Sequence, residues 1–175
     1  GNLGWTILAA GIAIFGRIAI QKVYSLTIGH VGEFRTWWVG LLISLVLCFI
    51  SAGYVPLAFA GYISATMITR HRLGMFRFGS NVEDCAIIGF WGIFASLILA
   101  TLFQIGNYFL PSLIFFKKGV LISIVFAICS VLPLPRMEGL TIFFGSKNMY
   151  AITLVMVLIV SLLLMVGGEI GLLIT

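Results

Sequence analysis

The sequence predicts an all-α membrane protein that crosses the bilayer several times, and both composition and charge spacing support this prediction. Of the 175 residues, 62% are hydrophobic and 9% are charged, whereas a soluble domain needs roughly a quarter charged residues to cover its surface. Uncharged apolar runs recur along the chain, several of them close to the about 20 residues that a spanning helix needs. Water-soluble enzymes, nucleic-acid-binding domains and disordered linkers are excluded, and residues 1–175 are expected to form a single transmembrane domain.

Charges and helix-breaking residues divide the apolar sequence into six expected spans. Arg17 lies near the end of the first apolar segment, and no charge occurs from Thr36 to Thr69. Gly53 and Pro56 predict a break within that long run, because proline removes a backbone donor and glycine loosens a helix. The expected spans are 3–20, 38–52, 55–69, 86–104, 119–134 and 149–167. A single helix over 36–69 is the alternative and would reduce the number to five.

The basic residues predict how the chain is oriented. The net charge is +5, and lysine and arginine gather in cytoplasmic loops, where they also attract anionic lipids. Six spans put two basic residues, Lys117 and Lys118, on one side and the other eight on the opposite side: Arg17, Lys22, Arg35, Arg70, Arg72, Arg77, Arg136 and Lys147. We therefore expect a plasma-membrane protein with cytoplasmic loops at 21–37, 70–84 and 135–148, and with both termini outside.

Aromatic and basic residues close to the expected spans predict anchors at the membrane interface. The segment 70–84 alternates basic, aromatic and glycine residues, so a short interfacial hairpin is expected there. Tryptophan pairs, aromatic rings and guanidinium groups suit the head-group region. The expected anchors are Arg35, Trp37, Trp38, Phe76 and Arg77.

The cysteines and histidines do not predict a cofactor site. The three cysteines, Cys48, Cys85 and Cys129, lack the short spacings of zinc or disulfide sites, and we interpret them as small buried hydrophobic residues. His30 and His71 lie outside the expected spans, and no haem or iron–sulfur ligand set is recognisable. The first apolar stretch also lacks the basic region and cleavage site of a signal peptide.

Polar side chains in or beside the apolar segments are the candidate site, because such groups are costly in a bilayer. Arg17 and Gln21 are four residues apart and share one helix face, close to Lys22. Snorkelling to the head groups is one interpretation of these long side chains. Glu138 follows two prolines spaced by one residue, and we expect it on non-helical backbone. It is either a site that faces a watery cavity or the partner of Arg136 or Arg17.

Several of these stretches resemble the site-2 protease family, the intramembrane zinc metalloproteases, in its compact archaeal form. Members carry His-Glu-Leu-Ala-His-Lys, then Gly and Ala-Glu-Phe-Arg, and much later Pro-x-Pro-Pro-Leu-Asp-Gly followed by Phe-Phe-Gly-Ser-Arg. The chain has Gly29, Gly32-Glu-Phe-Arg35, Ser130-Val-Leu-Pro-Leu-Pro-Arg-Met-Glu-Gly139 and Ile142-Phe-Phe-Gly-Ser-Lys147. The resemblance spans about residues 15–150, and it implies a site-2 protease-like core and an archaeal source.

The resemblance also implies that the catalytic site is degenerate. The chain has Arg17-Ile18-Ala-Ile-Gln21 where the family has its His-Glu-x-x-His motif. Glu138 matches the third ligand, an aspartate, and Ile93 matches the family's conserved asparagine. Zinc catalysis needs about three protein ligands and a carboxylate that activates water. The resemblance therefore implies no metal, no other cofactor and no enzyme activity, and it suggests that Arg17 and Glu138 form an ion pair in the former site.

Three functions follow as hypotheses. The first is a non-catalytic accessory or structural subunit of a larger membrane protein complex, with other integral membrane subunits and lipids as partners and no nucleic acid. The second is a pseudoprotease that binds transmembrane clients and regulates them. The third is a small transporter or channel subunit, for which the sequence has few acidic or histidine relay residues.

Overall fold

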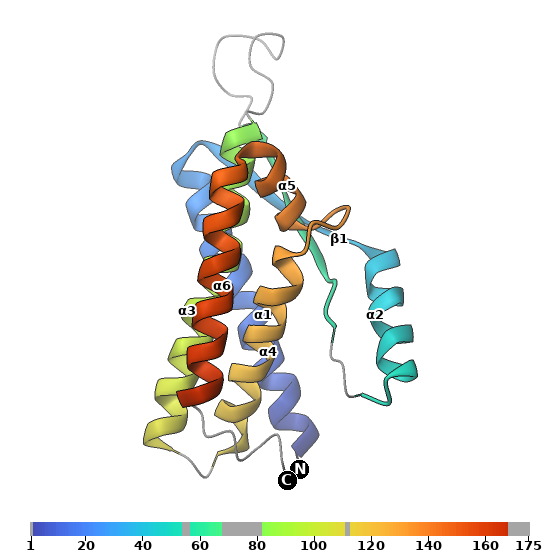
Figure 1. Cartoon of the computed structure of the whole chain (residues 1–175), viewed down its shortest axis with the longest axis vertical. Coiled ribbons are helices and arrows are strands. Elements are labelled where there is room, and N and C mark those ends of the chain that lie inside the picture. The colour runs from blue at the N-terminus through green and yellow to red at the C-terminus, as the bar shows by residue number, and fades with distance from the viewer. Residues whose placement is uncertain (1, 54–56, 68–81, 111–112, 168–175) are drawn as a thin grey trace.

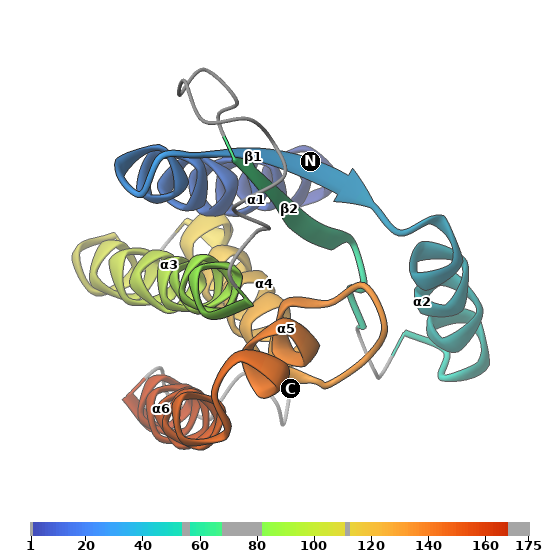
Figure 2. The same ribbon diagram turned by 90° about the horizontal axis from the view of Figure 1, so that it is seen from above.

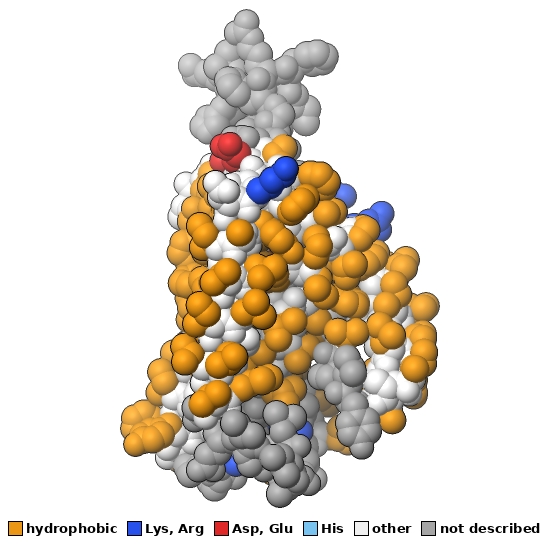
Figure 3. Space-filling view, viewed as in Figure 1, with side chains coloured by type: hydrophobic (Ala, Val, Ile, Leu, Met, Phe, Trp, Pro, Cys, Tyr) orange, Lys and Arg blue, Asp and Glu red, His pale blue; other side chains and the backbone are white. Residues whose placement is uncertain are grey.

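A computed structural model of the chain describes residues 2–53, 57–67, 82–110 and 113–167. Four helices in these ranges are long and apolar enough to cross a membrane: α1 (Asn2–Thr27), α3 (Val82–Phe109), α4 (Ile114–Val131) and α6 (Lys147–Gly167). These four helices form a bundle. The start of α1, the connection from α3 to α4 and the end of α6 all lie at the same end of this bundle (Figure 1). The chain is therefore a helical membrane protein, and hydrophobic side chains predominate over the middle of the face shown in Figure 3.

Helix α3 is the centre of the bundle. It contacts α1, α4, α6 and the short helix α5 (Glu138–Gly145), and 56% of its most apolar window is buried, against 17% for α1 and for α6. One core cluster joins α3 to α4, α5 and α6: Ile93, Leu97, Ala127, Val131, Ile142 and Val157. A second cluster joins it to α1 and α4: Ala13, Ala100, Phe103, Val120 and Ile124. The peripheral helices consequently present most of their apolar surface to their surroundings.

The prediction of six spans is wrong, because the uncharged run from 36 to 69 does not form two of them. Its first part is α2 (Trp38–Ile50), whose 13 residues rise about 20 Å, short of the roughly 30 Å hydrocarbon core. The expected span 55–69 is instead an extended segment at 57–60 followed by strand β2 (Gly61–Met67). The strand begins at a position that only glycine fits, because Gly61 has φ 141° and a Cβ there would lie 2.3 Å from the Arg35 carbonyl oxygen.

The two strands form an antiparallel hairpin from which α2 projects. Strand β1 (His30–Thr36) pairs with β2, with His30 opposite Met67 and Thr36 opposite Gly61. The Trp37 N–H then donates to the Ala60 carbonyl at 3.2 Å, which continues the ladder beyond the strands. Residues 37–60 therefore leave the sheet and return to it, and α2 lies to one side of the bundle (Figure 2).

The break predicted near Gly53 is present. Helix α2 ends at Ile50, and Ala52 and Gly53 both have positive φ, at 51° and 83°. Pro56, the other residue that predicted the break, lies outside the described residues. A chain reversal with two left-handed residues explains why a single helix over 36–69 does not form.

Side chains satisfy the backbone of the returning segment. The Phe59 N–H donates to Ser44 Oγ at 3.0 Å, and the Ala58 N–H donates to Cys129 Sγ at 3.4 Å. The Ser44 hydroxyl in turn donates to the Gly40 carbonyl at 2.9 Å. Irregular backbone at membrane depth is stable only where protein or water supplies its hydrogen bonds. Ser44 and Cys129 therefore allow an extended segment to lie beside the bundle.

We expect Ser44→Ala to lower the free energy of unfolding by about 1–3 kcal/mol, because it leaves the buried Phe59 N–H without its acceptor. Ser161→Ala is the matched control, since Ser161 is equally buried, with 8% exposed, and its hydroxyl bonds to the Leu158 carbonyl within its own helix. Denaturation of both variants in detergent checks the prediction. Equal losses for the two variants would contradict it.

The described basic residues on the connections and helix ends lie at the two ends of the bundle as predicted, although the run 36–69 does not form two spans. Four basic residues lie at the end of the bundle where the sheet, α5 and the start of α6 are found (Figure 1): Lys22 on α1, Arg35 on β1, Arg136 in the connection before α5, and Lys147 at the start of α6. Lys117 and Lys118 lie in the first turns of α4, at the opposite end. Helix α2 runs beside the bundle, and the chain comes back to the sheet in β2, so α3 begins at the same end of the bundle as it would after two spans. Most of the expected hairpin 70–84, including Phe76, Arg77, Arg70 and Arg72, lies outside the described residues, and residues 82–84 are part of α3.

Candidate functional site

Three helices bring the predicted polar residues together inside the bundle. Arg17 and Gln21 lie one turn apart on α1 and face inward, with 9% and 1% of their surfaces exposed. Glu138, with 4% exposed, is the first residue of α5. The expectation of non-helical backbone at Glu138 is therefore wrong: the two prolines lie within the irregular connection 132–137, and the helix starts immediately after that connection. Snorkelling is also wrong for Arg17, which is buried.

Glu138 is the centre of a hydrogen-bonded network. The Arg17 guanidinium donates through Nη2 to Oε2 of Glu138 and forms an ion pair with it, across 121 positions of sequence. Gln21 Nε2 donates to the other carboxylate oxygen, Oε1, at 3.1 Å, and to the Ile88 carbonyl of α3 at 3.0 Å. Both carboxylate oxygens thus accept hydrogen bonds, and α1, α3 and α5 are joined through polar side chains.

Burial and hydrogen-bonded partners have opposite effects on the pKa of Glu138. Burial raises the pKa of the Glu138 carboxyl, and the Arg17 guanidinium, the Gln21 amide and the Ser130 hydroxyl act in the opposite direction. Glu138 lies on α5, which is not one of the four candidate spans. Two charges removed from water in this way need each other, because either one alone would be uncompensated.

Glycines let the helices approach closely enough to form the network. A Cβ on Gly92 would lie 2.7 Å from Gln21 Nε2, so the amide occupies the space that any side chain at 92 would fill. A Cβ on Gly139 would lie 2.2 Å from the Val131 carbonyl oxygen, which fixes the start of α5 against the end of α4. The position of Glu138 is therefore set by backbone packing as well as by its hydrogen bonds.

We expect Gly92→Ala to cost about 1–3 kcal/mol of stability, because the new methyl displaces the Gln21 amide from Ile88 and Glu138. Gly11→Ala is the matched control on α1, where a Cβ meets nothing within 4 Å. It should leave stability unchanged or raise it by up to about 1 kcal/mol through helix propensity. Thermal unfolding in detergent measures both changes, and a neutral Gly92→Ala would show that the amide does not depend on this space.

The other predicted site residues lie apart from the network. Ile18 is half-buried on α1, and Ile93 is fully buried in the apolar core cluster with Leu97 and Val157. Among the anchors, Trp38 and Arg35 are exposed, whereas Trp37 packs in a cluster with Phe59, Cys129 and Met137. Sequence reasoning missed Gly92, Ser130 and the Ile88 carbonyl, because their roles depend on which faces of the helices meet.

The network does not have the donor set of a metal centre. Among the residues that the structure describes, no three histidine, cysteine, aspartate or glutamate side chains are grouped to hold a metal ion. His30 is buried, with 3% exposed, and its ring nitrogens have no hydrogen-bond partner in the described part of the chain. The guanidinium bound to Glu138 opposes a cation at that position. What the arrangement can do chemically is to join three helices by a neutralised polar contact.

The fold and the site define a helical membrane protein whose bundle encloses a buried ion pair. No protein-family model, no curated protein and no solved structure matches the chain. The resemblance to site-2 proteases thus depends on the quoted sequence motifs.

Proposed function

We propose that the chain is a non-catalytic, site-2 protease-like membrane protein that acts as a structural or accessory subunit of a larger membrane protein complex. One observation carries the proposal: Arg17, Gln21 and Glu138 meet at one place. The resemblance assigns metal-ligand positions to these three residues, and ligands of one metal must converge. A guanidinium and an amide stand there instead of imidazoles.

The chemistry of the network supports a role without catalysis. A zinc hydrolase needs about three protein ligands and a carboxylate that is free to accept a proton from water. Both oxygens of Glu138 already accept hydrogen bonds, and the nearest cation is the Arg17 side chain. Joining α1, α3 and α5 is what remains for these residues, which suits a scaffold.

Apolar outer faces support a role within a complex in the membrane. Only Gly40 and Ser44 are buried in α2, so the rest of this helix is available to neighbouring subunits or lipid. We place the end of the bundle that has Lys22, Arg35, Arg136 and Lys147 in the cytoplasm, following the positive-inside rule. The exposed side chains of α2 are large and apolar, so a neighbouring helix could pack against them through van der Waals contacts.

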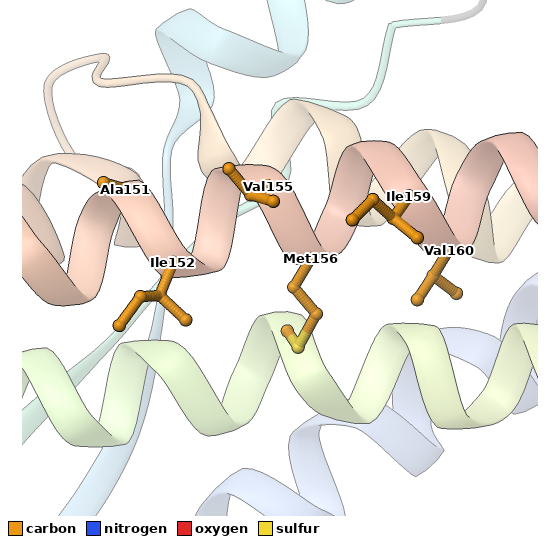
Figure 4. Close-up of a pocket in the computed structure, with 6 residues that line it drawn as sticks. All are labelled: Ala151, Ile152, Val155, Met156, Ile159 and Val160. Atoms are coloured by element: carbon orange, nitrogen blue, oxygen red, sulfur yellow. The ribbon is translucent and has the colours of Figure 1, made fainter.

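A groove on α6 favours the second candidate, a pseudoprotease that binds transmembrane clients. The groove has a volume of about 520 Å³ and only apolar lining residues: Ala151, Ile152, Val155, Met156, Ile159 and Val160 (Figure 4). An apolar client segment would find no hydrogen-bonding group among these side chains, so binding would depend on packing alone.

Purification from native membranes in mild detergent, followed by native mass spectrometry, tests the proposal. We expect the chain in a complex with one or more integral membrane proteins at fixed stoichiometry. The chain alone, or with clients at variable and substoichiometric amounts, would favour the pseudoprotease. One zinc ion per chain by metal analysis would contradict both functions, since each assumes a degenerate site.

A further inference from the structure

The charge of Arg17 lies inside a membrane-spanning helix, and its partner is made much later in the chain. The candidate span of α1 is Leu3–Thr27, and it has the lowest mean hydropathy of the four spans, 1.8 against 2.2, 2.1 and 2.8. Its carboxylate partner is 121 positions away. While α1 is synthesised and enters the membrane, the Arg17 charge therefore has no Glu138 to neutralise it.

Helix α1 packs against α3 and α4 on one side only, through apolar residues such as Ala13. Only 17% of its most apolar window is buried in the protein. Lys22, which is exposed, lies five residues beyond Arg17, or about 7.5 Å along the helix, and its side chain can extend toward head groups. Arg17 is instead turned inward, with 11% of its side chain exposed. An α1 without Glu138 would bring Arg17 to water by moving toward the basic end.

We infer that Glu138 completes the membrane insertion of α1. The helix reaches its final depth only when the carboxylate on α5 docks against Arg17 and neutralises it, because an unpaired arginine inside a span opposes insertion. In the assembled protein Gln21 donates to the same carboxylate and to the Ile88 carbonyl. This inference concerns assembly of the single chain, so it stands whether or not the chain has partner subunits.

A cysteine in place of Phe15 reports the depth of α1. Phe15 is 74% exposed on α1, two residues from Arg17, and therefore faces lipid when the helix is inserted. The full chain carrying F15C is synthesised into lipid vesicles and treated with a charged, water-soluble maleimide that reaches both membrane faces. Peptide mass spectrometry locates the label at residue 15, so the native cysteines stay in place.

We expect slow labelling of F15C alone and about tenfold faster labelling when E138A is added, because α1 then withdraws toward water. R17L combined with E138L should restore slow labelling, since no charge opposes insertion in that chain. E33A is the control for loss of a carboxylate, because Glu33 is exposed on β1. It should label as slowly as F15C alone.

Two results would overturn the inference. Slow labelling of F15C with E138A would show that α1 inserts without Glu138. The same conclusion would hold if E138A loosened the bundle but left α1 in lipid. Fast labelling of F15C with R17L and E138L would show that the Arg17 charge is not what opposes insertion. Neither result depends on copurified proteins, so failure here is distinguishable from failure of the proposed function.

Discussion

Glu138→Ala is expected to lower the free energy of unfolding by about 3–5 kcal/mol. The variant leaves the Arg17 guanidinium inside the bundle without its counter-ion, where the side chains of the pair are only 11% and 5% exposed. It also removes one of the two acceptors of Gln21. Denaturation with sodium dodecyl sulfate in mixed micelles, followed by circular dichroism, measures the loss in the assembled protein.

The informative control for Glu138→Ala removes both charges. Replacement of a buried ion pair by apolar residues of similar volume is often close to neutral, whereas removal of one partner is not. We therefore expect R17L combined with E138L to lie within about 1–2 kcal/mol of the wild type. Glu33→Ala, at an exposed glutamate, should change stability by less than about 0.5 kcal/mol. A loss below about 1 kcal/mol for Glu138→Ala would contradict a buried charge pair.

The sequence is informative about this pair because charges are so rare in it. Five acidic residues occur in 175, and a buried cation must find one of them or reach the membrane surface. The resemblance singled out Glu138 among the five, and the structure places it against Arg17. Long apolar helices were equally predictable, since α1, α3, α4 and α6 each contain one of the expected spans apart from a few residues at the ends.

An uncharged apolar run carries less information. Residues 57–67 contain no charge, so length and hydropathy allow either a span or a strand buried in protein. The structure has the strand, which begins where only glycine fits beside the Arg35 carbonyl, and Ser44 and Cys129 accept the backbone N–H groups next to it. These contacts join residues 15 to 71 positions apart, which hydropathy cannot detect.

The other contacts of the site depend on which faces of the helices meet, and this cannot be read from the sequence. Gln21 bonds to Ile88 and fills the space at Gly92 because one face of α1 meets one face of α3. Glycine is common in membrane helices, so Gly92 alone did not indicate a polar contact. The start of α5 at Glu138 was missed for a related reason: the two prolines predict irregular chain, but not where it ends.

Introducing the ligand residues that the resemblance to site-2 proteases implies is the second change with a large expected effect. A chain with R17H, I18E and Q21H presents two imidazoles one helical turn apart, and both positions contact Glu138 in the structure. Two histidines four residues apart and one carboxylate are a ligand set that holds zinc. We expect one zinc ion per chain, measured by inductively coupled plasma mass spectrometry after removal of loosely bound metal.

Stability should depend on zinc in the same variant. Without metal, R17H leaves Glu138 buried with no permanently charged partner, so the variant should unfold more easily than the wild type. Zinc supplies the missing positive charge and binds only the folded chain, so it should raise the unfolding midpoint, and a chelator should reverse the rise. The wild type should show no such response to zinc or chelator.

The matched control adds E138A to R17H, I18E and Q21H. It keeps both imidazoles and removes the third ligand, so stoichiometric zinc should be lost if position 138 completes the site. A chain with R17H, I18E and Q21H that folds but holds no more zinc than the wild type would contradict a former metal site at these positions. The meeting of residues 17, 21 and 138 would then be a helix contact with no relation to zinc proteases, and the proposed scaffold would lose the observation that carries it.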